Sequence, residues 1–432
     1  MNLHRTAIAA ALAAAILSPC AAFGAGYSIY EQGAAVLGMA GAATASVNDA
    51  SAVFYNPAAM TRLEGKQLYF GGTWLSTYTS FAGVEPFPGY GVTEAMKTGN
   101  FFPPTVYYVN HLNKKWAYGA GVNAPFGLGV EWENPLMFTG RERVTKADVR
   151  TINAGVDVAW APNDQYSVGV GYDALFAGVE LHNIMEQVVP GGGGAKLNVA
   201  EAELKSGYKA GQTWNAAAMW TPQPEWKFAV NYRARAHVKI DNGDATFTQI
   251  PTGSPALDAA VAAALPPAQT ASAVLKFPAM LSLAAAWKPT PEWTWEVDAN
   301  QTRWSFFDNL QIEFAKNPAI DQSISENYKD SWRVNVGAEH RLPGFTYRFG
   351  YYYDQAAAPD SSVTPLLPDA NRHGATIGLG FKLGKAKAWT LDWYNLFLFV
   401  ENRSTNGQNR DGYNGTYKSY VNATGLNLGY HW

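Results

Sequence analysis

The chain has 432 residues, of which 16% are charged and 14% aromatic, and its formal net charge is −3. The charged fraction lies well below the roughly 25% of ordinary globular domains, so the composition disfavours a soluble enzyme. The small negative charge offers no basic surface for nucleic acid, and we expect no nucleic-acid partner.

Residues 1–24 have the pattern of a cleaved secretory signal. Basic residues precede an apolar stretch that ends near Leu17, and small residues follow it. The stretch is too short to span a membrane as a helix, and no later segment offers about eighteen uncharged apolar residues. The only cysteine, Cys20, falls in this leader, and Pro19 directly before it argues against a lipid anchor. We therefore expect an exported protein without helical spans or disulfides.

Residues 25–65 differ from everything that follows. They are rich in Gly, Ala and Ser and show no sustained alternation before the first convincing strand begins at Lys66. We expect them to form a unit distinct from residues 66–432.

From Lys66 onward, apolar and polar residues alternate with period two in one segment after another. In one of them, Trp293, Trp295 and Val297 alternate with polar residues that include Glu296 and Asp298. A helix would need apolar residues at spacings of three and four. Fourteen strand candidates begin near residues 66, 104, 115, 146, 165, 200, 225, 275, 291, 330, 345, 373, 388 and 416.

Strands with one apolar and one polar face suit an outer-membrane barrel, because one face of each strand meets lipid and the other a polar lumen. The last residues, Gly425 to Trp432, alternate in this way and end on an aromatic residue. A soluble edge strand would also alternate, but the leader and the repetition favour the envelope. We predict an all-β fold, a transmembrane antiparallel β-barrel of 14 strands formed by residues 66–432. Residues 25–65 are then predicted to be a plug inside its lumen.

Turns, loops and tryptophans give the barrel an orientation. Tight turns such as Pro343-Gly344 alternate with long connections, predicted at 184–199, 240–274, 305–329 and 355–372, and the long side should face outward. Tryptophans near strand ends suit the water-lipid boundary; they are Trp160, Trp226, Trp287, Trp293, Trp304, Trp332 and Trp389. The Ala-rich stretch from Pro255 to Leu265 predicts a short loop helix, which either covers the barrel mouth or lies free on the surface.

One segment predicts a basic lumen face. From Trp226 to Val238, apolar residues alternate with Arg233, Arg235, His237 and, just beyond, Lys239. We expect a single strand here, with its apolar side toward lipid.

The motif Tyr55-Asn56-Pro57-Ala58, preceded by Asn48-Asp49-Ala50, resembles the N-terminal hatch of the FadL-type outer-membrane transporter family. Later stretches in matching order, among them Leu275 to Pro278, extend the resemblance along most of the chain. This family takes up long-chain fatty acids and other hydrophobic molecules through a plugged barrel. The resemblance implies a transporter of the bacterial outer membrane that needs no cofactor, with surrounding outer-membrane lipid and a hydrophobic small molecule as partners. It further implies that Asn48, Asp49, Asn56, Pro57 and Ala58 shape the plug. We expect a monomer.

Pro125 is a candidate lateral gate. Proline cannot donate to a strand ladder, yet every strand of a closed barrel is interior. Together with Gly127, Pro125 is predicted to bend the strand inward and open a gap in the wall; the alternative is a bulge near the rim. The family releases its ligand sideways through such a gap. By the same resemblance, Tyr27 and Ile29 reach into the ligand pocket, and the neighbouring Phe126 and Leu128 are candidate ligand contacts.

The charge of the ligand stays open at this point. Fatty-acid transporters of the family place basic side chains in the pocket, where a carboxylate can form charge-assisted bonds. The matching positions fall near Asn183, beside His182, and near Gln311, and none of these is permanently charged. His182 and Asn183 are candidate ligand contacts, and neutral alkanes or monoaromatics are the alternative ligands. Arg233 and other basic residues could supply charge instead.

Two other classes are weaker. An outer-membrane lipid hydrolase would need a histidine base beside a serine or carboxylate, but the seven histidines are scattered and no GxSxG-type elbow occurs. We therefore expect no enzyme and no metal site. A general porin or adhesin would lack the plug.

Overall fold

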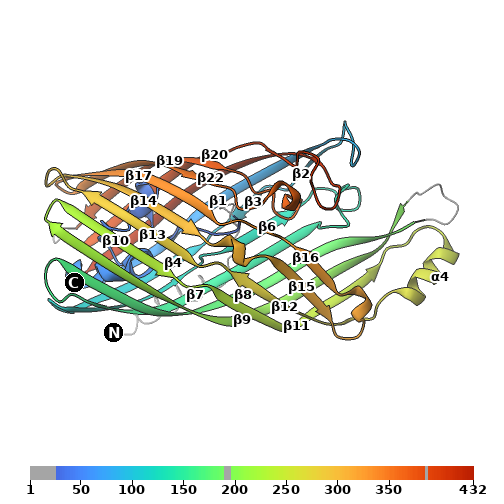
Figure 1. Cartoon of the computed structure of the whole chain (residues 1–432), viewed down its shortest axis with the longest axis horizontal. Helices are drawn as coiled ribbons and strands as arrows, with labels where there is room; N and C mark the ends of the chain where they lie inside the picture. Colours follow the sequence, from blue (N-terminus) through green and yellow to red (C-terminus); the bar gives the residue numbers. More distant parts are fainter. Residues whose placement is uncertain (1–25, 189–195, 385–387) are drawn as a thin grey trace.

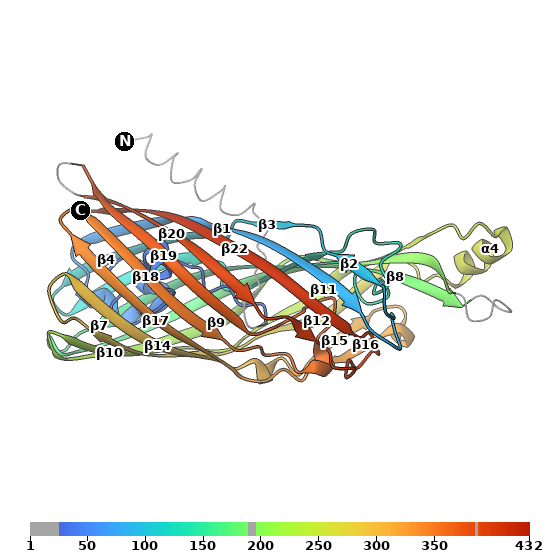
Figure 2. The same ribbon diagram turned by 90° about the horizontal axis from the view of Figure 1, so that it is seen from above.

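The computed structural model describes residues 26–188, 196–384 and 388–432. Figures 1 and 2 show an elongated barrel with short turns at one end and long hairpins at the other. The chain from residue 26 enters the barrel interior before the first wall strand. The predicted leader, residues 1–24, lies outside the described residues. None of the helices in the described part of the chain has the length and apolar character of a membrane span.

The wall consists of fourteen strands, four of them built from two consecutive pieces. In chain order the wall elements are β1 (Lys66–Gly83), β4 (Pro104–Asn113), β5 (Trp116–Asn123) with β6 (Gly127–Glu131), β7 (Lys146–Trp160), β8 (Tyr166–Val188), β9 (Lys196–Gln223), β10 (Trp226–Arg233) with β11 (Ala236–Gln249), β12 (Gln269–Phe277) with β13 (Met280–Trp287), β14 (Trp293–Thr302) with β15 (Asn309–Phe314), β17 (Ser331–Leu342), β18 (Phe345–Asp354), β19 (Arg372–Leu383), β20 (Trp389–Val400) and β22 (Gly415–His431). Short additions are β2 (Thr93–Ala95), β3 (Gly99–Phe101), β16 (Gln322–Ser325) and β21 (Arg403–Ser404).

Antiparallel pairing closes the sheet on itself. Each wall strand pairs with the next along the chain, as β7 does with β8 and β19 with β20. The first and last strands also pair, with Gln67 opposite His431 and Gly83 opposite Gly415. The predicted 14-stranded antiparallel barrel is confirmed, and the starts of its strands lie close to the predicted positions.

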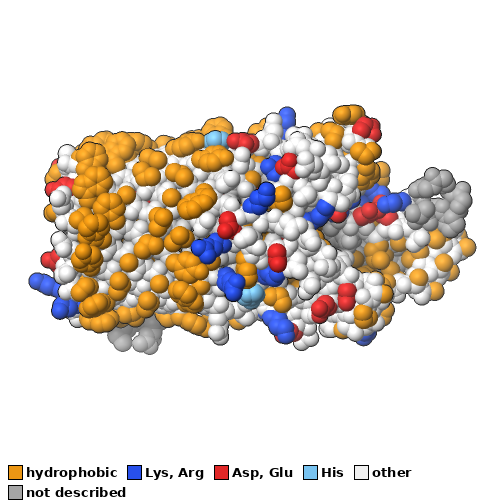
Figure 3. Space-filling view, in the orientation of Figure 1, with side chains coloured by type: hydrophobic (Ala, Val, Ile, Leu, Met, Phe, Trp, Pro, Cys, Tyr) orange, Lys and Arg blue, Asp and Glu red, His pale blue; other side chains and the backbone are white. Residues whose placement is uncertain are grey.

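Side chains alternate between the outside and the lumen as expected. Leu426 on β22 is 51% exposed, and Trp432 just after this strand is 52% exposed. Asn427 is only 2% exposed and donates to Thr105 Oγ1 over 3.0 Å. Figure 3 shows hydrophobic side chains gathered over the part of the barrel near the short turns, with charged side chains over the rest. Exposed tryptophans belong to this band, among them Trp116, Trp160, Trp220, Trp226, Trp287 and Trp389. Trp304 was wrongly assigned to the girdle, because it is fully buried against the N-terminal segment.

Two hairpins extend much farther than a membrane requires. A spanning strand needs about 9–11 residues, but β8 has 23 and β9 has 28. Much of the predicted loops 184–199 and 240–274 is therefore strand. The loop helix is confirmed as α4 (Pro255–Ala264). Figures 1 and 2 place it at the far tip of the β11–β12 hairpin, away from the barrel mouth.

The predicted continuous strand from Trp226 to Val238 is wrong, because β10 ends at Arg233 and β11 starts at Ala236. Arg233 is buried, as expected for a lumen residue. After the two-residue break the phase reverses, so that Val238 is buried while His237 and Lys239 are exposed. The basic face therefore continues outside the barrel beyond Arg233.

The N-terminal segment, residues 26–65, lies inside the barrel and is almost wholly buried. It contains α2 (Ala34–Gly38), α3 (Ala52–Tyr55) and the 3-10 helix η1 (Pro57–Arg62). Its backbone bonds to wall side chains: Ala34 N donates to Asn427 Oδ1 over 2.9 Å, and Thr44 N donates to Asp298 Oδ2 over 3.1 Å. Three further 3-10 helices lie in the loops, namely η2 (Trp304–Phe306), η3 (Pro318–Ile320) and η4 (Asp360–Ser362).

Candidate functional site

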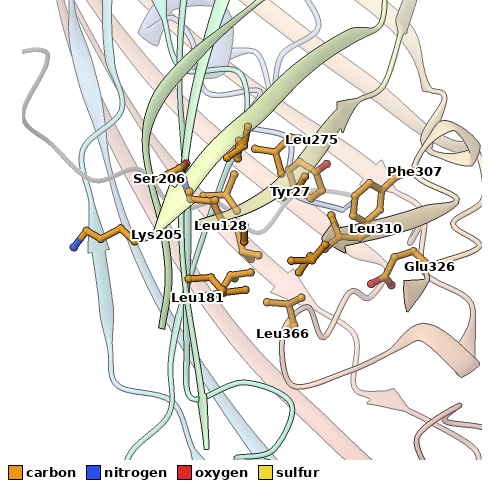
Figure 4. A pocket seen from close by; sticks show the side chains of 18 of the residues that line it. Tyr27, Leu128, Leu181, Lys205, Ser206, Leu275, Phe307, Leu310, Glu326 and Leu366 are labelled. Atoms are coloured by element: carbon orange, nitrogen blue, oxygen red, sulfur yellow. Dashed lines mark hydrogen bonds between the residues drawn. The ribbon is translucent and has the colours of Figure 1, made fainter. Parts of the chain in front are cut away.

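An apolar cavity lies above the N-terminal segment, toward the long hairpins. Its empty volume is about 980 Å³, counted out to its open side. The wall is mainly aliphatic and aromatic, and Figure 4 shows side chains from several strands converging on it, including Leu128, Leu181, Leu275, Phe307, Leu310 and Leu366. Ligand sites for apolar molecules typically have this size and lining. We call this space the apolar cavity.

Tyr27 of the N-terminal segment forms part of this cavity wall, and its predicted contact with a ligand stays a prediction. Its ring packs edge-on against four aromatic rings, with centroid distances of 4.7 Å to Trp304, 5.7 Å to Phe307 and 6.1 Å to both Phe126 and Phe277. The Tyr27 hydroxyl donates to a backbone carbonyl, that of Lys276, over 2.9 Å. Aromatic packing and this hydrogen bond hold the start of the segment at the cavity.

The strand break at Pro125 is held by the same segment. Ile29 N donates to Pro125 O over 2.8 Å, and Gly127 N donates to Tyr27 O over 2.9 Å. Residues 27–29 therefore pair with residues 125–127, where the wall strand lacks its usual neighbour. Ile29 and Phe126 are buried at this contact and do not line the apolar cavity, whereas Leu128 does.

The wall is unpaired beside this break. β4 pairs with β5 as far as Val106 opposite Val122. Bonding to β6 resumes only where Lys97 N donates to Glu131 O over 2.8 Å. Between these two positions, no strand pairing in the described residues joins the β5–β6 strand to the strand beside it. The wall strand is interrupted between β5 and β6, around Pro125. The inward bend and the role of the interruption as a lateral gate stay predictions.

A second interruption lies between β9 and β11. β10 pairs with β9 as far as Arg233 opposite Asn215. The pairing returns, now between β11 and β9, at Asp244 opposite Lys205. Register shifts near the unpaired stretch, in β8–β9 pairing and again in β11–β12 pairing, mark β-bulges that bend the strands apart. Residues at both edges, including Ser206 on β9 and Ile240 on β11, line the apolar cavity.

Few charges reach the apolar cavity. Among the described residues that line it, Lys205 is the one base, and Figure 4 shows its side chain directed away from the cavity. Its Nζ lies 3.2 Å from Glu180 Oε2. On another side Glu326 forms two contacts with Arg410, of 3.1 and 3.2 Å. Burial raises the pKa of the Glu326 carboxyl, an effect that Arg410 partly offsets.

The structure does not bring His182 and Asn183 to the apolar cavity. Their neighbour Leu181 lines it, but His182 lies between Glu180 and Glu201, at 3.1 and 2.9 Å. Asn183 donates to the backbone carbonyl of Glu142 over 2.9 Å. The period-two alternation of β8 directs His182 to the face opposite Leu181. Gln311 is exposed, while its neighbours Leu310 and Ile312 line the cavity.

A cluster of possible metal ligands surrounds His182. Atoms of Glu180, His182 and Glu203 lie within 4.8 Å of one another. Lys205 contacts both glutamates, at 3.2 and 3.9 Å. Lys146 also bonds Glu180, so the two lysines together already balance the negative charge of the two glutamates that would attract a cation.

Two of the predicted plug residues, Asn56 and Pro57, shape the local structure of the N-terminal segment. Asn56 Nδ2 donates to Thr44 O over 2.7 Å, and its Oδ1 accepts from Ala58 N over 3.1 Å. Asn56 thus caps η1, and Pro57 occupies the first helical position, where its missing N–H costs nothing. Asn48 and Asp49 instead line a cavity near the short turns.

A polar cavity lies directly below the apolar one, toward the short turns. On the wall strand formed by β12 and β13, Phe277 lines the upper space and Met280 the lower. Tyr27 faces the upper cavity, and the adjacent Ser28 and Tyr30 face the lower one. The polar cavity has an empty volume of about 760 Å³. Sequence analysis missed this space because its lining comes from eight separate segments of the chain.

Comparison with known proteins identifies the family. A family model described as "Outer membrane protein transport protein (OMPP1/FadL/TodX)" matches residues 15–432. The chain belongs to this family. Its members are transporters rather than enzymes, and it is accordingly an outer-membrane β-barrel transporter of hydrophobic compounds.

Individual relatives are distant but nearly full-length. The chain is 25% identical to the long-chain fatty acid transport protein of Salmonella typhi, over 88% of this chain and 89% of that one. It is also 25% identical to outer membrane protein P1 of Haemophilus influenzae, over 96% and 97% of the two chains.

Solved structures share the fold. A FadL homologue of Pseudomonas aeruginosa has a TM-score of 0.82 at 21% identity, over 94% of this chain and all of that one. The toluene transporter TodX of P. putida has a TM-score of 0.70 at 17% identity, over 93% and 99%. These similarities concern the fold alone.

Proposed function

We propose that this protein takes up long-chain fatty acids or similar hydrophobic molecules, which it captures in the apolar cavity. The observation that carries the proposal is the joint position of Tyr27, whose ring lines the cavity while its backbone pairs with the broken strand. A ligand that displaces Tyr27 would also loosen the contact at Gly127. Capture and opening would then be coupled through residues 27–29, acting within a plug formed by the N-terminal segment.

The two unpaired stretches of wall supply a path. The β9–β11 interruption borders the apolar cavity near the long outer hairpins, so it serves as the access side. The break at Pro125 serves as the lateral exit. Such a route keeps the ligand in apolar surroundings, because an apolar solute gains nothing from passing through water. Catalysis has no part in this proposal, and the absence of lipid hydrolysis by the purified protein would support it.

Neutral hydrocarbons are a second candidate ligand class. The supporting observation concerns Lys205, the one base that lines the apolar cavity within the described part of the chain: it points away and is engaged by Glu180. A carboxylate placed in this cavity would therefore lack a cationic partner, whereas an alkane or a monoaromatic needs none.

Competition against one fluorescent lipid probe bound to the purified barrel tests both candidates. Displacement chiefly by a long-chain fatty acid supports the first, and displacement chiefly by a neutral aromatic hydrocarbon supports the second. If neither compound displaces the probe while the barrel is folded, the apolar cavity is not a ligand site.

A further inference from the structure

The polar cavity contains a buried arginine with unused hydrogen-bond donors. Arg333, on β17, is 8% exposed, and its guanidinium carbon lies 4.5 Å from the Tyr30 ring centre and 3.7 Å from that of Tyr352. Its Nε and Nη2 have no hydrogen-bond partner among the residues that the structure describes. A buried N–H group normally finds an acceptor, so the site lacks a group that the two donors could serve.

The geometry of these two nitrogens defines the missing acceptor. In a guanidinium group, Nε–H and one N–H of Nη2 point the same way from one edge of the plane. This edge matches the two oxygens of a carboxylate in a bidentate pair. The rings of Tyr30 and Tyr352 fix the plane by cation–π contact and leave its edge available.

The residues that line the polar cavity include more bases than acids. Three arginines line it, Arg233, Arg333 and Arg372, against two acids, Glu31 and Asp354. Arg233 is engaged by Asp173 over 2.6 Å, a residue outside the lining.

The two acids also have other partners in the structure. Asp354 lies 3.6 Å from Arg372. Glu31 accepts a hydrogen bond from Tyr30 N over 3.0 Å. The negative charges of both acids act on the Arg333 guanidinium. Neither acid accepts a hydrogen bond from its Nε or Nη2.

We propose that Arg333 binds the carboxylate of an amphipathic organic acid in the polar cavity, through Nε and Nη2. The apolar chain of the acid extends upward into the apolar cavity once residues 27–30 shift. This inference rests on the proposed uptake function and deepens it, because it supplies the charged anchor that the apolar cavity lacks. Selectivity for acids then arises one level below the site of apolar capture.

The test compares a long-chain fatty acid with its methyl ester, which has the same chain but no charge. Each competes with a fluorescent apolar probe on the full-length barrel. The wild type is expected to bind the acid at least about tenfold more tightly than the ester, the strength of a charge-assisted pair. Arg333→Gln should remove this preference by weakening acid binding about tenfold and leaving ester binding unchanged.

Two control variants sharpen the comparison. Arg333→Lys keeps the charge but lacks the planar edge, so part of the acid preference should remain. Arg235→Gln removes an exposed arginine that stacks on Phe306, and it should change neither ligand. Folding of each variant is checked by its heat-modifiable mobility.

If the wild type binds acid and ester equally, the proposed site is wrong, and no variant is needed to show it. This result is expected if water, rather than a carboxylate, bonds to Nε and Nη2 of Arg333. Equal losses of acid and ester in a folded Arg333→Gln barrel would also overturn it, since Arg333 would then serve structure alone. If neither ligand displaces the probe from the wild type, the uptake proposal fails and the site fails with it.

Discussion

At the scale of single residues, the lumen contains buried groups of opposite charge in direct contact. Arg348 lies between Glu339 and Asp392, with contacts of 2.6 and 2.7 Å, and all three side chains are almost fully buried. Removing one member of a buried set leaves the others uncompensated in a poorly solvated place. The set lies at the level of the N-terminal segment. Arg348 and Asp392 line the same cavity as Asp49 of that segment.

Arg348→Met is expected to destabilise the barrel by about 3–5 kcal/mol, because it leaves the buried Asp392 without its cationic partner and Glu339 with Arg341 alone. Urea unfolding in lipid vesicles, followed by tryptophan fluorescence, measures this change. Arg341→Met is the matched control, since Arg341 contacts the same Glu339 from a half-exposed position. Its cost should stay within about 1 kcal/mol. Equal costs for the two variants would contradict the burial argument.

Glu326 predicts a pH dependence of ligand binding. Its pKa is raised above the ordinary 4.5 by burial, so it is protonated up to a higher pH than a surface glutamate. The protonated form adds no charge to the apolar cavity, so stability and apolar affinity should both be highest at low pH and fall as pH rises through the raised pKa. Glu326→Gln should flatten this profile for a neutral probe. A wild-type affinity that rises with pH would show that the sign is wrong.

At the scale of elements, the two strand interruptions differ in how well the sequence signals them. Pro125 indicates the first interruption in the sequence itself, because proline cannot donate a hydrogen bond to the strand ladder. The break after Arg233 has no such residue, and the apolar alternation continues across it in the sequence. The reversal of faces at His237 therefore could not be read from the pattern, since it depends on two residues leaving the ladder.

Replacing Pro125 and Gly127 with alanine should slow uptake while leaving the barrel folded. Alanine at position 125 restores an N–H donor, so the strand can continue its ladder and narrow the unpaired stretch. Uptake of labelled ligand by cells that carry the variant is the measurement, with surface expression as the control. Uptake at the wild-type rate would remove the lateral exit from the mechanism.

Wall glycines set how closely the N-terminal segment approaches. A Cβ added at Gly337 would lie 2.4 Å from the backbone oxygen of Met39, whereas one at Gly207 meets nothing within 4 Å. Gly337→Ala should push the segment from the wall and lower the unfolding midpoint, and Gly207→Ala should have little effect. Similar midpoints for both variants would indicate that the segment adjusts without cost.

At the scale of the whole molecule, sequence periodicity predicts the barrel well and the binding site poorly. Strand starts are visible because lipid on one side and the lumen on the other impose a period of two along the chain. Tyr27 and Leu128 were predicted at the cavity, but His182 turns away, and Phe277 and Phe307 were not foreseen. A cavity gathers residues from distant strands, so its members share no local pattern.

Deleting residues 25–65 tests the plug at this scale. The segment fills the lumen with buried side chains, so its removal should open a water-filled passage. Ion conductance of the reconstituted variant in planar bilayers should rise sharply over that of the full chain. Unchanged conductance would show that this segment does not close the barrel to ions.

Pairing between β1 and β22 has a consequence for how the chain folds. These strands lie more than three hundred residues apart in sequence, yet their seventeen paired positions form the seam of the wall. Contacts so distant form slowly, because most of the chain must be ordered before they are made. Until the seam closes, two edges with free N–H and C=O groups stay open to neighbouring chains. The unfinished barrel is thus the form most prone to aggregation, and it needs protection on its way to the membrane.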